Sequence, residues 1–227
     1  DPANPGSQTR DRFILSKGHA APALYATLAR KGFIAPKLLR SLRKTGSPLQ
    51  GHPCMHLVPG VDLSTGSLGM GLSAGLGMAL AARSAGKDWR VFVLCGDGEL
   101  DEGQNWEAFM ALAKWKPANL TAVIDYNHVQ LDGPTDTIMP IPNLKAKLQA
   151  FGLHIVECDG HDTAALLQAF AEAVQATDPA VIIARTIKGK GVSFMENEAA
   201  WHGKPVDVND FDTARRELEE ELERMQQ

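Results

Sequence analysis

A short apolar run that ends in Gly-Asp-Gly is the feature that most constrains the fold of this chain. The run Val91–Cys95 leads directly into Gly96-Asp97-Gly98. Such a run is typical of a buried strand, and the two glycines let the backbone approach a bound anion closely. A helix predicted over Gln104–Trp115 begins soon afterwards, so its free amide groups can face the same place. We therefore predict that Asp97 lies at the carboxyl end of a strand, in a site for a diphosphate and a divalent metal.

A second strand is expected to bring further metal ligands to the same edge. The apolar segment Leu120–Asp125 is one helical crossover away from the first strand, and Asn127 follows its end. Parallel strands joined in this way have their carboxyl ends at one edge of the sheet. Magnesium favours octahedral oxygen coordination from one or two side chains, phosphates and water. Asp97, Asn127 and the carbonyl of Val129 are the predicted ligands, with Ca²⁺ or Mn²⁺ as possible substitutes. The alternative is a tight turn without a ligand.

The remaining sequence alternates between strand and helix patterns. Runs rich in Val and Ile occur at His154–Glu157 and Ala180–Arg185, and amphipathic segments occur at Trp106–Trp115 and Thr163–Gln175. This alternation predicts an α/β fold, with a mostly parallel sheet and helices on both faces. Proline- and glycine-rich stretches without helical periodicity are predicted to form loops around the site: Thr45–Ser67, Leu131–Pro142 and Lys188–Pro205. The charged end, Arg215–Gln227, is predicted to be a solvated or partner-facing helix.

Length and charge limit the class of protein. A chain of 227 residues with 44% hydrophobic content can bury one substantial core, so residues 1–227 are predicted to form a single domain. The net charge of −4 and the lack of a long basic run argue against nucleic-acid or membrane partners. The three cysteines share no CxxC spacing, which favours reduced thiols in the cytoplasm. The most membrane-like stretch, Gly66–Ala82, is short and interrupted by serines, which favours a close-packed soluble helix.

Several motifs resemble those of transketolases. The stretch Gly96–Ala108, which reads GDGELDEGQNWEA, and the triplet Asp125-Tyr126-Asn127 resemble the thiamine diphosphate motif of that family. Further stretches agree in the family's order: Arg10–Ala20 (RDRFILSKGHA), Gly51-His52-Pro53, Ser64–Gly69 (STGSLG), Lys188–Val192 (KGKGV) and Trp201-His202-Gly203. The resemblance extends from about Asn4 to His202. It implies the thiamine-diphosphate-binding fold of the diphosphate domain.

The resemblance also implies roles for individual residues. The implied cofactor-binding residues are Gly66, Ser67, Leu68, Gly96, Asp97, Gly98, Glu99, Asn127 and His202. The implied catalytic residues are His19, His52 and His202, of which His52 is assigned to the donor sugar's hydroxyl and to proton transfer. Judged from its own segment alone, each histidine would more often be structural, and the resemblance reverses that weighting. Glu102 is implied in a carboxylate network that links active sites across a dimer, although an acid favoured by the helix dipole is the alternative.

The implied activity is the transfer of a two-carbon ketol unit from a ketose to an aldose, as in the pentose phosphate pathway of carbohydrate metabolism. Transketolases need two further domains, a pyrimidine-binding domain and a carboxyl-terminal domain, and neither is present in these residues. We therefore expect the amino-terminal subunit of a split transketolase, active only with a separate partner subunit in an α2β2 heterotetramer. The alternatives are a non-catalytic cofactor-binding or regulatory subunit, a component of another thiamine diphosphate enzyme, or an isolated excised domain.

Three other motifs have competing interpretations. Gly69–Ala74 resembles a dinucleotide fingerprint, but a poor strand precedes it, so small residues for close helix packing are the preferred interpretation. His52, Cys54 and His56 could suggest zinc, yet a fourth ligand is not apparent. His161, at the end of a predicted strand, is expected to serve a turn or a helix cap.

Overall fold

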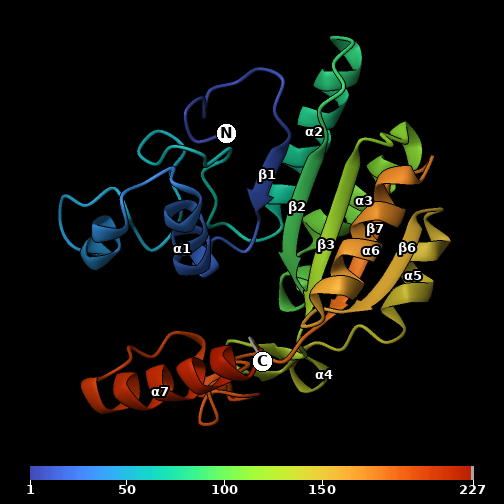
Figure 1. The fold of residues 1–227 in the computed structure, drawn as a ribbon. Coiled ribbons are helices and arrows are strands. Elements are labelled where there is room, and N and C mark those ends of the chain that lie inside the picture. The colour runs from blue at the N-terminus through green and yellow to red at the C-terminus, as the bar shows by residue number, and fades with distance from the viewer. Residues whose placement is uncertain (226–227) are drawn as a thin grey trace.

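The structure, a computed structural model, describes residues 1–225 and is built around a five-stranded parallel sheet (Figure 1). The strands are β1 (Arg12–Leu15), β2 (Val91–Gly96), β3 (Leu120–Tyr126), β6 (His154–Asp159) and β7 (Ala180–Arg185), in the order β1-β2-β3-β7-β6. The four predicted strands are confirmed, three of them with one or two additional residues. β1 was not predicted. It pairs only with β2, with Phe13 opposite Phe92.

The described residues also form seven α-helices and a small hairpin, besides short 3₁₀ helices. The helices are α1 (Ala21–Lys31), α2 (Met70–Ser84), α3 (Gly103–Trp115), α4 (Thr135–Ile138), α5 (Leu144–Ala150), α6 (Thr163–Gln175) and α7 (Val208–Met225). The hairpin joins β4 (Val129–Gln130) to β5 (Gly133–Pro134). Both predicted amphipathic helices, α3 and α6, are confirmed. The α6 helix begins where the Asp162 carboxylate accepts the amide N–H groups of Ala164 and Ala165.

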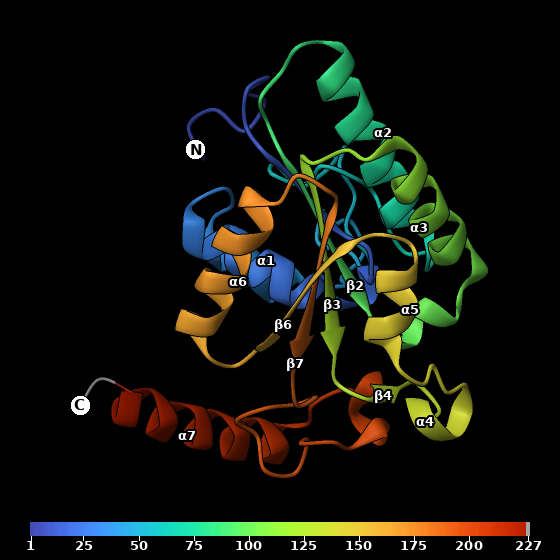
Figure 2. The same ribbon diagram turned by 90° about the vertical axis from the view of Figure 1, so that its right-hand side faces the viewer.

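Helices cover both faces of the sheet, as predicted. Figure 2 shows α2, α3 and α5 on one face and α6 on the other. Alternation along a strand sends successive side chains to opposite faces. Thus Val91 and Val93 of β2 are fully buried in the cluster that includes α2 and α3, whereas Ile182 of β7 is buried with Ala169 of α6. A separate small core lies under α1, around Tyr25 and Leu49.

Helix α2 packs unusually close to the sheet. A Cβ atom added at Gly71 would lie 2.3 Å from Ser16 Oγ, and one added at Gly75 would lie 2.5 Å from Val93 Cγ2. Neither position has room for a side chain. This confirms small residues for close packing as the interpretation of the glycine motif. The residues before Gly69 form no strand in the described part of the chain, so the dinucleotide alternative lacks the element it needs.

The predicted loops have different outcomes. Thr45–Ser67 is irregular throughout, as predicted, and Lys188–Pro205 contains only a short 3₁₀ turn, Ala199–His202. The prediction of a plain loop at Leu131–Pro142 was wrong, because this stretch contains β5 and α4.

The charged carboxyl-terminal segment is helical, as predicted, but its helix begins earlier. Helix α7 starts at Val208, seven residues before the expected Arg215, and Gln226 and Gln227 lie outside the described residues. The helix lies apart from the layered body, on the side to which the strands point (Figure 1). Within residues 1–225, no helix is both long enough and apolar enough to cross a membrane.

Candidate active site

Asp97 directly follows β2 and is buried without a cation. Its Oδ1 accepts the amide N–H of Gly98 at 2.8 Å, and its Oδ2 accepts that of His128 at 2.5 Å. Only 5% of the residue is exposed, and burial raises the pKa of its carboxyl group, with the charge of Asp125 adding to the effect. Among residues 1–225, no Lys, Arg or His side chain forms an ion pair with it. A buried carboxylate in this state fits a bound divalent cation.

The other two predicted metal ligands lie at the same turn. Asp97 is held beside β3 because its amide N–H donates to the carbonyl of Asp125 at 3.2 Å. Asn127 Oδ1 accepts the amide N–H of Val129 at 3.0 Å, across His128, whose φ is 62°. The carboxylate of Asp97 and the amide oxygen of Asn127 therefore both bond to the backbone of this one turn. Their remaining oxygen lone pairs and the Val129 carbonyl are hard ligands of the kind that magnesium takes.

The protein alone offers few anionic ligands here. In residues 1–225, no group of three or more His, Cys, Asp or Glu side chains could hold a metal ion. A metal at Asp97 would therefore need amide and carbonyl oxygens together with phosphate oxygens from a cofactor. The same absence holds for His52, Cys54 and His56, so among residues 1–225 they form no zinc-binding group.

Three glycine-containing segments pack closely against one another near the site. A Cβ atom on Gly18 would lie 2.8 Å from Thr65 Oγ1 and 2.9 Å from the amide nitrogen of Gly66. A Cβ atom on Gly66 would lie 3.2 Å from Cγ of the His52 ring. The SKGHA, GHP and STGSLG motifs, separate in sequence, are thus brought into one cradle whose narrow spacing requires glycine. Within it, Gly66 and Leu68 are partly buried, whereas Ser67 is exposed.

Two of the predicted catalytic histidines touch. The ring centroids of His19 and His202 are 5.0 Å apart. Burial, and then the charge of His202, lowers the pKa of His19 to about 4, so its imidazole is neutral near pH 7. Burial also lowers the pKa of His202, and its Nδ1 atom is buried and has no hydrogen-bond partner within residues 1–225. Such an orphaned nitrogen fits a site that is completed by a ligand. His52 is exposed, with its ring against Gly66.

Two lysines add positive charge that the sequence-based site did not include. Lys17 forms an ion pair with Asp125, whose carboxylate also accepts the hydroxyl of Thr186. Lys188 is partly buried, and burial and then the charge of Lys17 lower the pKa of its ammonium group. Within residues 1–225, Lys188 forms no ion pair. An anion such as a diphosphate fits this group of Lys17, Lys188 and His202. Their presence in the SKGHA, KGKGV and WHG motifs was the available sequence signal.

The carboxylate of Glu99 is bound by hydrogen bonds from other groups of the protein. It is 3% exposed. It accepts hydrogen bonds from the Ser16 hydroxyl at 2.5 Å and from the amides of Gly69 and Gly96 at 2.9 and 3.1 Å. These contacts join the ends of β1 and β2 to the start of α2. Glu99 therefore shapes the site from beneath, and its direct contact with the cofactor stays a prediction.

Glu102 and His161 lie where helices begin or turns form. Glu102 is exposed at the N-cap of α3, with its Cβ 2.7 Å from the Cβ position of Gly69, so both of its predicted roles remain open. His161 lies in a turn, as predicted, but it is not the helix cap, because Asp162 caps α6. Its Nε2 instead accepts the amide N–H of Ile187 at 2.7 Å and so fixes the residue before Lys188.

Comparison with known proteins identifies the family of this chain. Residues 1–224 match the family described as transketolase, thiamine diphosphate binding domain. The 6-deoxy-6-sulfo-D-fructose transketolase subunit of Clostridium sp. strain MSTE9 is 44% identical over 222 residues, covering 97% of this chain and 81% of that protein. An apulose-4-phosphate transketolase subunit from Phocaeicola vulgatus is 40% identical over 227 residues, covering 99% of this chain and 80% of that protein.

A solved structure shows the same fold in a much longer chain. The transketolase of Campylobacter jejuni superposes with a TM-score of 0.91 at 31% identity, over 96% of this chain. The aligned part is 35% of that transketolase, so the present chain spans about a third of it. The layered sheet, the Asp97 turn and the histidine cradle thus occur in a chain that belongs to the transketolase family and forms its thiamine diphosphate binding domain.

Proposed function

We propose that this chain is the amino-terminal subunit of a two-chain transketolase, which transfers a two-carbon ketol unit from a ketose to an aldose. The observation that carries the proposal is a pair of opposite charge imbalances at one edge of the sheet. Among residues 1–225, neither the buried Asp97 nor the partly buried Lys188 forms an ion pair, although the charges of Asp125 and Asp97 act on Lys188. A divalent metal bound to a diphosphate compensates both. The names of the two subunit relatives support the division into two chains.

The chain's own residues divide the work. Asp97, Asn127 and the Val129 carbonyl hold the metal, for which we propose Mg²⁺, while Lys188 orients the diphosphate. When bound, thiamine diphosphate supplies the carbon nucleophile that carries the two-carbon unit. The exposed His52, at the edge of the cradle, faces the sugar and moves a proton to or from its hydroxyl.

The neighbouring histidines are set for hydrogen bonding. Because the pKa of His19 is lowered to about 4, its ring is neutral at pH 7 and can both donate and accept. The buried Nδ1 of His202 offers a hydrogen bond to a ligand. Gly66, Ser67 and Leu68 approach the cofactor rings, and Gly96, Gly98 and Glu99 shape the diphosphate end of the site.

The rest of the active site belongs to a partner. We propose that a separate subunit carries the pyrimidine-binding and carboxyl-terminal domains and supplies the glutamate that activates the cofactor. Two copies of each chain form an α2β2 assembly, in which the exposed Glu102 joins a carboxylate network between sites. The three unpaired cysteines, Cys54, Cys95 and Cys158, support a cytoplasmic location.

Turnover with and without the partner tests this function. We expect the purified chain alone to show no ketol transfer and the mixture with the pyrimidine-domain subunit to show it, in the presence of Mg²⁺ and thiamine diphosphate. A coupled assay on several ketose and aldose pairs provides the measurement. Turnover by the chain alone, verified free of partner by mass spectrometry, contradicts the two-chain proposal. Cofactor binding without turnover in the mixture supports the non-catalytic alternative instead.

A further inference from the structure

Helix α7 carries an exposed apolar stripe with coiled-coil spacing. Positions 208, 211, 215, 218, 222 and 225 are separated by three and four residues in turn, which is the spacing of a helix–helix seam. Five of the six are apolar and exposed: Val208 77%, Phe211 55%, Leu218 47%, Leu222 56% and Met225 76%. The sixth is Arg215. The helix has no buried residue, so this stripe is left without a cover in the described part of the chain.

The same helix contains the chain's charge imbalance. Its 18 residues include seven acidic and three basic side chains, a net charge of −4, which equals the formal net charge of all 227 residues. The remainder of the chain is therefore balanced. A second copy of α7 would meet the first with like charge, which disfavours self-association through this helix. A partner with basic residues beside apolar ones would complement it.

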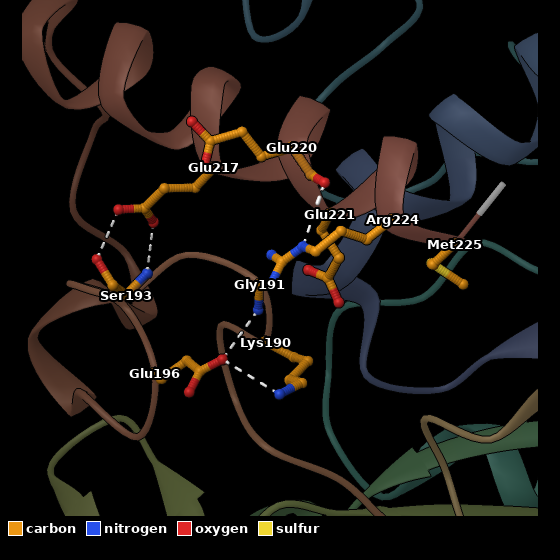
Figure 3. A pocket seen from close by; sticks show the side chains of 9 residues that line it. All are labelled: Lys190, Gly191, Ser193, Glu196, Glu217, Glu220, Glu221, Arg224 and Met225. Atoms are coloured by element: carbon orange, nitrogen blue, oxygen red, sulfur yellow. Dashed lines mark hydrogen bonds and ion pairs between the residues drawn. The ribbon is translucent and has the colours of Figure 1, made fainter. Parts of the chain in front are cut away.

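The contacts of α7 are made with one loop, which also reaches the active site. The Glu217 carboxylate accepts the amide N–H and the hydroxyl of Ser193, both at 2.7 Å. Between the helix and this loop lies an open groove of about 520 Å³, bordered by Glu217, Glu221 and Arg224 on one side and by Gly191 on the other (Figure 3). The loop continues from Lys188, so α7 and the diphosphate end of the site share one segment.

The position of α7 agrees with the approach of a partner. The parallel strands point their carboxyl ends towards the side of the molecule on which α7 lies (Figures 1 and 2). Asp97 and Asn127 lie at these strand ends, so a subunit that completes the cofactor site must approach from this side. The exposed helix stands beside that approach.

We propose that the apolar stripe and acidic groove of α7 form the docking surface for the subunit that carries the pyrimidine-binding domain. This inference rests on the proposed two-chain function. The complementary element of the partner presents apolar side chains at helical spacing, flanked by Lys or Arg. Binding buries the stripe and neutralises the negative charge of the helix. Through the Glu217–Ser193 contact it also restrains the loop that holds Lys188.

Calorimetric titration with the purified pyrimidine-domain subunit tests the surface. We expect Leu222→Lys to weaken partner affinity about 10-fold or more, because it places a charge in the apolar stripe. Leu167→Lys is the matched control: Leu167 is 67% exposed on α6, outside the stripe of α7, and its substitution should leave affinity unchanged. At saturating partner, turnover of Leu222→Lys should return to the wild-type value. Circular dichroism checks folding, and Met225→Lys repeats the test if Leu222→Lys unfolds.

Charge provides a second arm. The double variant Glu220→Lys/Glu223→Lys should weaken binding and reduce its dependence on salt concentration. Equal affinities of wild type and Leu222→Lys for the partner would overturn the proposal. It would also be overturned if Leu222→Lys abolished self-association of the chain alone while partner affinity stayed the same. If the two-chain function itself is wrong, the wild-type chain will not bind the pyrimidine-domain subunit. This result is obtained before any variant is compared, so the two failures are distinguished.

Discussion

The cofactor edge and helix α7 are built in opposite ways. At the cofactor edge, Asp97 and Glu99 are almost completely buried, and their carboxylates are held by backbone and side-chain hydrogen bonds. In α7 no residue is buried, and its large apolar side chains are exposed. The first region is formed by hydrogen bonds within the chain. The second region combines exposed apolar and charged side chains, as an interface does, and no residue of α7 is buried against the rest of the described chain. The difference fits the proposal that the metal and diphosphate end of the site lies in this chain, whereas turnover needs a partner subunit.

The largest effect is expected at Asp97. Asp97→Ala removes the buried carboxylate that we propose as a metal ligand, and we expect Mg²⁺-dependent thiamine diphosphate affinity to fall roughly 100-fold or more, beyond the 10–100-fold typical of outer-shell partners. Asp101→Ala, at an exposed neighbouring position, is the control and should change affinity little. Calorimetry on the assembled enzyme measures both. Equal affinities of wild type and Asp97→Ala would remove Asp97 from the metal site.

The effect expected at His52 falls on chemistry rather than on cofactor binding. In the assembled enzyme, His52→Ala should lower kcat roughly 10²–10⁴-fold, the usual contribution of a positioned proton donor or acceptor, with cofactor affinity nearly unchanged. A rise in KM at normal kcat would indicate a role in sugar binding alone. Wild-type values of both constants, in a folded variant, would make His52 structural.

Packing provides a direct test of the contrast between the body and α7. Gly71→Ala places a Cβ atom 2.3 Å from Ser16 Oγ, so we expect it to lower the free energy of unfolding by about 1–3 kcal/mol. Gly77→Ala on the same helix meets no atom within 4 Å and should raise stability by about 0.5–1 kcal/mol. Leu222→Ala in α7 should stay within about 0.5 kcal/mol of wild type. Urea denaturation of the isolated chain gives all three values. A large loss for Leu222→Ala would mean that α7 is part of the core.

The smallest expected effect is on pH dependence. In the unfolded chain His19 takes up a proton near its ordinary pKa of 6.5, whereas in the folded chain it does so only near about 4. The stability associated with its neutral ring is therefore complete above pH 6.5 and is lost as the pH falls towards about 4. His19→Gln should show a shallower decline in the free energy of unfolding over this window. Parallel curves for wild type and variant would show that the His19 ring is not as buried as described.

Prediction from the sequence worked best where local pattern and tertiary structure agree. The apolar runs of β3 and β7 are buried on both faces, and those of β2 and β6 are mostly buried or partly buried, so composition alone identified them. The strand β1 has only four residues and contains Arg12 and the partly exposed Phe13, so it has little signal apart from its pairing with β2. Helix α4 was missed because its four residues are too few to show helical periodicity.

The sequence by itself determined the fold class, the family, and the types of residue available for a metal and a diphosphate, because these depend on short motifs and strand ends. Only the tertiary structure decided which of those residues share an environment. Contact between His19 and His202 depends on how distant loops meet, as does the pairing of Lys17 with Asp125. Burial then lowers the pKa of both histidines, because the cost of a charge depends on the atoms around it rather than on neighbours in sequence. The exposure of the apolar stripe of α7 likewise depends on how the rest of the chain packs.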